Sequence, residues 1–146
     1  VARKAFEHAF YPDTISTDLH RYCVGDPFQV DLLSTLSKFR ALGMTLNETV
    51  LKCTLNPARA VGREAELGTL RLGGVADVLV FEEEDGEFEF MDTHFQTLKA
   101  SKRLRACHVI RQGCLWNPDA HPISLRDLYD SDREVIDAMR PPAEKN

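Results

Sequence analysis

The sequence predicts an α/β chain in which helices come first, strands follow and a polar tail closes the molecule. In the first part, apolar residues recur at helical spacing between capping residues. Further on, dense Val and Leu runs lie between turn residues, a pattern typical of strands. The last part is polar and contains two capping-box motifs, which predict short helices. We therefore divide the chain into residues 1–62, 63–116 and 117–146.

The beginning of the chain predicts a helix and then a strand. Apolar residues from Ala2 to Phe10 fall at helical spacing, and the helix should stop before Pro12 because proline disfavours helical geometry in the residue ahead of it. The segment from Thr14 to Leu19 is short and partly β-branched, as a strand would be. The chain begins with Val1 and not with methionine, so we expect it to be part of a longer protein.

A second helix is predicted by its caps and its apolar stripe. Asp26 before Pro27 forms a good N-cap and first-turn pair, and the apolar stripe continues to Leu42, ahead of Gly43. This pattern predicts a helix from Pro27 to Leu42.

Two shorter helices should follow. The segment from Thr45 to Glu48 has the form of a capping box, which predicts a helix running to about Cys53. Asn56 to Arg59 should begin another helical turn, closed by Gly62. Asn56, Pro57 and Arg59 are therefore expected to have structural roles in capping and packing.

Extended structure is predicted in residues 63–116. Ala76 to Phe81 reads as a buried strand, and Phe88 to Phe90 as a second strand after an acidic turn from Glu82 to Gly86. Asp77 is expected to mark an edge or turn of this region. A hairpin should form around Gln112-Gly113, between Cys107 to Arg111 and Cys114 to Trp116.

Composition narrows the function classes. The formal net charge is -5, which argues against nucleic-acid binding, and no apolar run approaches the roughly 20 residues that span a bilayer. We therefore expect a cytoplasmic protein with no membrane partner. The scattered cysteines have no zinc-site spacing, so they are expected to be reduced thiols: Cys23, Cys53, Cys107 and Cys114.

Polar side chains gather where the strand from Thr14 should give way to a loop. In an extended segment, Ser16, Asp18 and His20 would point to one side, so that a carboxylate and an imidazole share a face. Such residues are also common in turns and on surfaces, so this pattern alone leaves both interpretations open. No ligand-like spacing is present at the other histidines, which are His8, His94, His108 and His121.

A family resemblance decides between these interpretations. Leu51 to Gly62 (LKCTLNPARAVG), then Gly68 to Leu70, then Gly73 to Phe81 (GGVADVLVF) resemble in order and spacing the C-terminal signature of the amidohydrolase superfamily. That superfamily includes dihydroorotases and deacetylases, and the parent protein is expected to be dihydroorotase-like. The residues Thr-Ile-Ser-Thr-Asp-Leu-His around Asp18 look most like the amidohydrolase/deacetylase branch.

The resemblance implies a fold assembled from two parts. Residues 1–62 would form the C-terminal end of a (β/α)8 TIM barrel, with Thr14 to Thr17 as its eighth strand and Pro27 to Leu42 as the helix behind it. Residues 63–116 would be part of a small β-sandwich, and residues 117–146 a C-terminal helical tail. Catalytic groups of such barrels lie at the C-terminal ends of the strands, where Asp18 would fall.

The resemblance also implies a chemistry. Asp18 would be both a metal ligand and the catalytic group that accepts a proton from water and returns it to the leaving group. His20 would contact the substrate or support the aspartate, and a surface histidine without such a role stays the alternative. The cofactor would be one or two divalent metal ions, with zinc the expected metal, and their other ligands would precede Val1. The reaction would be hydrolysis of an amide, cyclic amide or acyl ester in a small acylated substrate.

One carboxylate does not hold a zinc ion, which takes three or four protein ligands, so this chain alone is expected to be inactive. Its expected partner is the remainder of the barrel or an upstream chain, and a homo-oligomer is possible. Two alternatives stay open: a non-catalytic scaffold or oligomerisation module derived from an amidohydrolase, and a self-contained small α/β domain.

Overall fold

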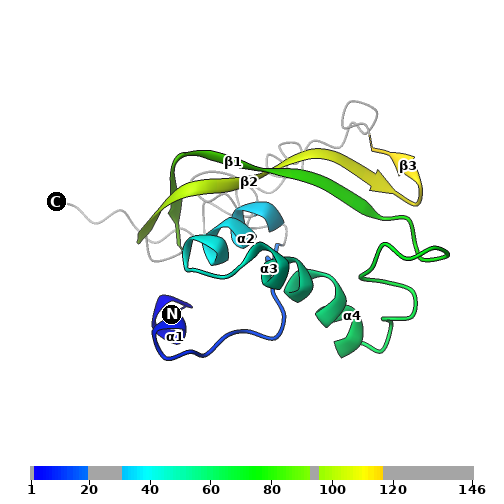
Figure 1. Cartoon of the computed structure of the whole chain (residues 1–146), viewed down its shortest axis with the longest axis horizontal. Coiled ribbons are helices and arrows are strands. Elements are labelled where there is room, and N and C mark those ends of the chain that lie inside the picture. Colours follow the sequence, from blue (N-terminus) through cyan, green and yellow to red (C-terminus); the bar gives the residue numbers. More distant parts are fainter. Residues whose placement is uncertain (1, 20–30, 93–95, 117–146) are drawn as a thin grey trace, which may run out of the picture.

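The computed structural model describes residues 2–19, 31–92 and 96–116. Within these residues, a long antiparallel sheet arches over a layer of helices (Figure 1). This arrangement confirms the predicted mixture of helix and strand. The assignment to a barrel end and a β-sandwich stays a prediction.

The first two helices differ from their predicted bounds. Helix α1, Ala2–Glu7, ends three residues earlier than expected. Helix α2, Leu32–Ala41, does not begin at Asp26-Pro27. Its N-cap is Asp31, whose backbone is extended and whose carboxylate accepts a hydrogen bond from Ser34 N at 2.8 Å. An extended residue interrupts a helix, so the predicted helix from Pro27 to Leu42 is wrong in its start, and residues 20–30 lie outside the described part.

Helices α3 and α4 follow the predicted signals. Helix α3, Leu46–Cys53, begins with the predicted capping box: Thr45 Oγ1 accepts from Glu48 N, and the Glu48 carboxylate accepts from Thr45 N at 2.8 Å. Helix α4, Leu55–Ala60, is followed by Gly62 with φ +69°, the left-handed conformation expected at a helix end.

The two strands predicted over Ala76 to Phe81 and Phe88 to Phe90 are wrong as separate elements, because the residues from Val78 on belong to one continuous strand. Strand β1, Val78–Met91, pairs antiparallel with β2, Thr97–Arg111, and β2 pairs with the short β3, Cys114–Leu115. The predicted hairpin between β2 and β3 is confirmed, with Gln112 at φ +50° and Gly113 at φ +79°. Both values suit the tight turn that joins antiparallel strands.

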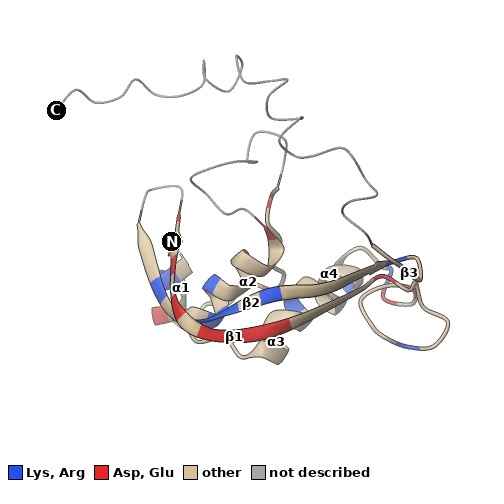
Figure 2. Ribbon diagram, turned by 90° about the horizontal axis from the view of Figure 1, so that it is seen from above, with Lys and Arg blue, Asp and Glu red and all other residues tan. Residues whose placement is uncertain are grey.

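The predicted acidic turn from Glu82 to Gly86 is wrong, because Glu82 to Asp85 belong to the middle of β1. Their partners on β2 are basic or apolar, so the acidic run is matched across the strands instead of being exposed in a turn (Figure 2). The ion pairs are Glu82 with Arg105, Glu83 with Lys102, Glu84 with Arg103 and Asp85 with Lys102. Opposite charges at facing positions stabilise strand pairing and fix its register.

Glu83 also joins the sheet to the helices. Its carboxylate accepts hydrogen bonds from Lys102 Nζ at 2.9 Å and from Arg40 of α2 at 2.7 Å. These two donors hold the pKa of Glu83 below its usual value, with Lys102 the larger cause. The Arg103 guanidinium likewise lowers the pKa of Glu84.

Acid should therefore weaken the fold through Glu83. A carboxyl group whose pKa is lower in the folded state contributes stability that is present above its unfolded pKa of about 4.3 and is lost as the pH falls through the folded value. We expect the urea midpoint to fall between about pH 5 and pH 3, and to fall less in Glu83→Gln. Glu87→Gln, at an exposed position of the same strand, is the control. If the urea midpoint depended on pH equally in both variants, Glu83 would not be the source of the acid sensitivity.

The core lies between the helices and the sheet. Its buried members come from the segment ahead of α2, from α2 and the turn after it, and from β2. They are Ile15, Leu33, Leu36, Met44 and Leu104. Phe6 of α1 packs against this cluster and contacts the Phe39 ring, with centroids 6.0 Å apart.

A buried hydroxyl links helix α2 to the sheet. Ser37, which is 1% exposed, donates to Leu33 O at 2.7 Å and accepts from Leu104 N of β2 at 2.9 Å. The hydroxyl thus satisfies a buried strand amide that would otherwise lack a partner.

Gly68 lies where the chain after α4 passes against the junction of α3 and α4. A Cβ at this position would come within 2.8 Å of Leu55 Cα and Thr54 O, and the backbone φ is +81°. We expect Gly68→Ala to destabilise the protein by more than the roughly 1–3 kcal/mol of backbone strain alone. Gly73→Ala is a matched control, because Gly73 has the same φ and no atom within 4 Å of its Cβ position. Urea denaturation of both variants measures the difference, and equal losses would refute the close contact.

No described helix is long and apolar enough to cross a membrane. Cys53, Cys107 and Cys114 are free, as predicted, and Cys23 lies outside the described residues. Burial raises the pKa of the Cys53 thiol, which therefore stays protonated at neutral pH.

Candidate functional site

Asp18 lies in an irregular segment, not at the end of a strand. Residues 10–19 contain no strand in the described structure, so the predictions of a strand over Thr14 to Leu19 and of an eighth barrel strand over Thr14 to Thr17 are not met. A strand needs a neighbouring chain to accept and donate its backbone hydrogen bonds. The segment finds one such partner in the described residues: Ile15 N donates to Lys52 O at 2.8 Å.

The extended backbone that would give Ser16, Asp18 and His20 a common face is interrupted at Asp18. Asp18 has φ +52°, which breaks the alternation of side chains that an extended chain would give. The Leu19 amide donates to Thr17 Oγ1 at 3.1 Å, so the hydroxyl stabilises a local turn around Asp18. Asp18 is exposed. His20, the expected substrate contact, lies outside the described residues.

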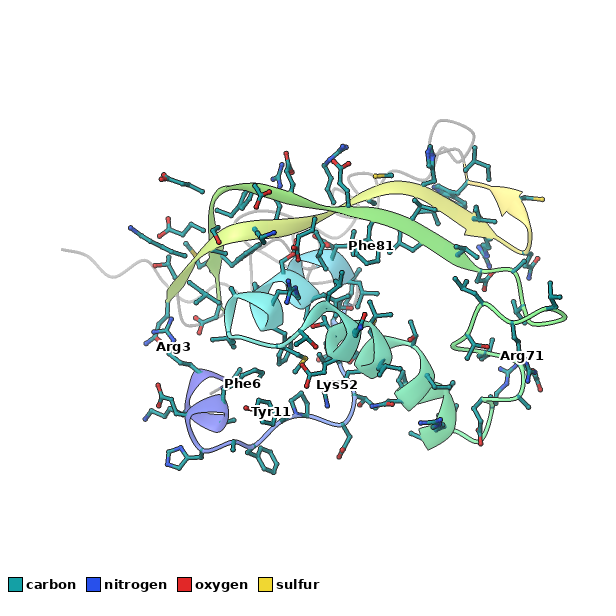
Figure 3. All side chains as sticks on the ribbon, in the orientation of Figure 1. Arg3, Phe6, Tyr11, Lys52, Arg71 and Phe81 are labelled. Carbon is teal, nitrogen blue, oxygen red and sulfur yellow. The ribbon has the colours of Figure 1, made fainter. Side chains whose placement is uncertain are left out.

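Three hydrogen bonds tie the segment ahead of Asp18 to the ends of α3 and α4. Besides the Ile15 contact, Lys52 Nζ donates to Pro12 O at 2.5 Å and Asn56 Nδ2 donates to Asp13 O at 2.9 Å. Figure 3 shows Lys52 projecting from α3 toward the chain that follows Tyr11.

Sequence reasoning did not find these contacts. Asn56 was expected to act as a cap, but the N-cap of α4 is Thr54, and the Asn56 amide instead reaches back 43 residues to Asp13. Lys52 was assigned no role. Local spacing carries no signal for partners so far apart in the chain.

The described residues do not form a metal site by themselves. Among them, no group of three or more His, Cys, Asp or Glu side chains is placed to hold a metal ion. Asp18 offers an exposed carboxylate, a donor type that divalent cations accept, but a single carboxylate is an incomplete ligand set. Any ion bound at Asp18 needs ligands from other residues.

A large apolar groove lies between the helices and β1. Its volume is about 930 Å³, and Asp18 is not among the residues that line it. Asp77, the acidic residue of its lining, accepts a hydrogen bond from Gln112 N at 2.7 Å. This contact fits the predicted role of Asp77 at a turn. The groove is lined mainly by apolar side chains, including Leu33, Leu36, Leu51, Val61, Leu70 and Phe81.

Comparison with known proteins identifies the chain's relatives. The model of the amidohydrolase family matches residues 2–109, which include Asp18, Lys52 and Asn56. A deacetylase of Brucella anthropi is 33% identical over 94 residues, which are 64% of this chain and 23% of the relative. A deacetylase of Agrobacterium fabrum is 34% identical over 94 residues, with the same two shares.

Two solved structures resemble the fold. An adenine deaminase structure matches with a TM-score of 0.73 and 27% identity, over 80% of this chain and 31% of the other. A dihydroorotase structure matches with a TM-score of 0.64 and 28% identity, over 78% of this chain and 30% of the other. The chain thus spans about a quarter of the length of the curated relatives and under a third of these structures.

Proposed function

Because the chain belongs to the amidohydrolase family, we propose that it is part of a metal-dependent hydrolase that cleaves a carbon–nitrogen or ester bond in a small acylated molecule. The match over residues 2–109 carries this proposal. The deacetylase relatives favour an acyl group on the substrate, and the adenine deaminase and dihydroorotase structures favour a non-peptide carbon–nitrogen bond.

Asp18 is the proposed catalytic group of this chain. Its carboxylate would accept a proton from the attacking water and return the proton to the leaving amine or alcohol. Asp18 is exposed, and this exposure supports the role, because a carboxylate that exchanges protons with water and substrate must be accessible to them. His20, two residues later, is the proposed substrate contact.

The proposed cofactor is one or two divalent ions, with zinc the expected metal. Asp18 would supply one oxygen ligand, and the other ligands would come from residues outside the described part. When bound, such an ion would lower the pKa of water to near 7, which makes hydrolysis possible at neutral pH.

The proposed partner is the remainder of a barrel, supplied by residues that the relatives carry outside the matched segment. The apolar groove supports this proposal, because a concave surface lined by apolar side chains can receive another part of a protein. The uncovered apolar side chains include Leu51, Val61 and Leu70. A cytoplasmic location and a homo-oligomer also stay proposals.

The test is to express the full-length protein that contains this chain, measure its metal content and assay N-acyl amino acids and acyl esters. We expect a bound divalent metal and hydrolysis of at least one substrate class, with no turnover by the present chain alone. A metal-free full-length protein without turnover would favour the non-catalytic module derived from an amidohydrolase.

A further inference from the structure

The chain ahead of Asp18 is fixed to the helices at three backbone positions. Pro12 O and Asp13 O each accept a hydrogen bond from a side chain, at 2.5 Å from Lys52 Nζ and 2.9 Å from Asn56 Nδ2. Ile15 N donates to the Lys52 carbonyl at 2.8 Å. Residues 12–15 are thereby held through two carbonyl acceptors and one amide donor of their own backbone.

The break between α3 and α4 makes these contacts possible. Thr54, with φ -125° and ψ -83°, ends one helix and begins the other. The last four carbonyls of a helix have no partner within it, so Lys52 O is available to Ile15. Asn56 lies in the first turn of α4, close enough to reach Asp13 O.

A buried side chain completes the attachment. Ile15 is 6% exposed and belongs to the core cluster with Leu33 and Leu36. The backbone is therefore fixed at Ile15, and two residues separate this fixed point from Asp18. Asp18 has φ +52°, and the Thr17 hydroxyl accepts a hydrogen bond from the Leu19 amide.

We propose that Lys52 and Asn56 are positioning residues for Asp18, acting through their hydrogen bonds to Pro12 O and Asp13 O. This inference rests on the proposed function of Asp18. Neither side chain needs to touch substrate. A misplacement of about 1 Å in a reacting group can reduce the rate by about 100-fold, so two bonds that set the course of residues 12–15 affect the reaction.

The test uses the full-length protein with Lys52→Met, Asn56→Ala and the double variant. Lys99→Met and Asn47→Ala are matched controls, because both residues are exposed and neither side chain is hydrogen-bonded to residues 12–19. Lys52→Arg keeps a charged donor and should restore function. Amide hydrogen exchange over residues 14–19 is measured beside kcat and KM.

We expect the double variant to lower kcat by about 10- to 100-fold with little change in KM, and to speed exchange over residues 14–19 while β1 and β2 stay protected. Unchanged exchange over residues 14–19 would overturn the proposal, as would unchanged kcat. If a variant fails to fold, Lys52→Arg and the two single variants carry the same measurements.

Asp18→Asn separates this inference from the function beneath it. If Asp18→Asn is inactive while the double variant is fully active, only the positioning role is overturned. If Asp18→Asn keeps full turnover, the proposed function and the positioning role both fall.

Discussion

Replacing Asp18 by asparagine is expected to reduce turnover of the full-length protein by about 10²- to 10⁴-fold, the contribution of a positioned general acid–base group. Asparagine keeps the size and one oxygen acceptor of the side chain but does not take up and return a proton at neutral pH. The measurement is kcat on whichever acylated substrate the protein hydrolyses, together with its metal content.

The fold should tolerate this change. Asp18 is exposed and has φ +52°, a conformation that asparagine adopts as readily as aspartate. The thermal transition should therefore stay near that of the unaltered protein. Asp13→Asn is the matched control, because Asp13 is an exposed acid of the same segment. Wild-type turnover in Asp18→Asn, or equal losses in the two variants, would reject the catalytic role.

The parts of the fold that the sequence predicts correctly are those determined by interactions between neighbouring residues. The capping box at Thr45 and the Gln112-Gly113 turn are both decided by neighbouring residues, and both form as expected. The helix end at Gly62 belongs to the same class, since a glycine tolerates the left-handed conformation found there.

The errors occur where distant partners decide. The acidic run from Glu82 to Asp85 has the composition of a turn, yet basic residues about 20 positions later draw it into a strand. Asp31 caps α2 in place of Asp26, although both are aspartates ahead of an apolar stripe. Such competition between local signals and tertiary partners is not visible in one segment of sequence.

The candidate site divides in the same way. Asp18 could be proposed as a catalytic residue from the sequence motif around it, because the residue types themselves carry the family resemblance. The contacts of Lys52 and Asn56 could not be predicted, since they join main-chain oxygens of Pro12 and Asp13, which have no sequence signature. The predicted strand failed for a related reason, because strands require partners that the described residues do not supply.

Leu36→Ala is expected to destabilise the core while Asp18, Lys52 and Asn56 stay intact. Leu36 is 2% exposed and lies in the core cluster with Ile15, ahead of Asp18, and Leu104 of β2. Removal of a buried leucine side chain costs about 2–5 kcal/mol through lost burial and the cavity left behind. Leu36 also borders the apolar groove, so neighbouring side chains and water can fill part of the space, and we expect the lower half of that range.

Urea denaturation measures this loss, with the midpoint lowered and the m-value unchanged if the native state stays compact. Leu72→Ala is the control, because Leu72 is fully exposed and its truncation should change stability by less than about 0.5 kcal/mol. Since Ile15 loses a core neighbour in Leu36→Ala, amide exchange over residues 14–19 should also become faster. A variant as stable as Leu72→Ala would show that Leu36 does not hold the helices, the sheet and the Asp18 segment together.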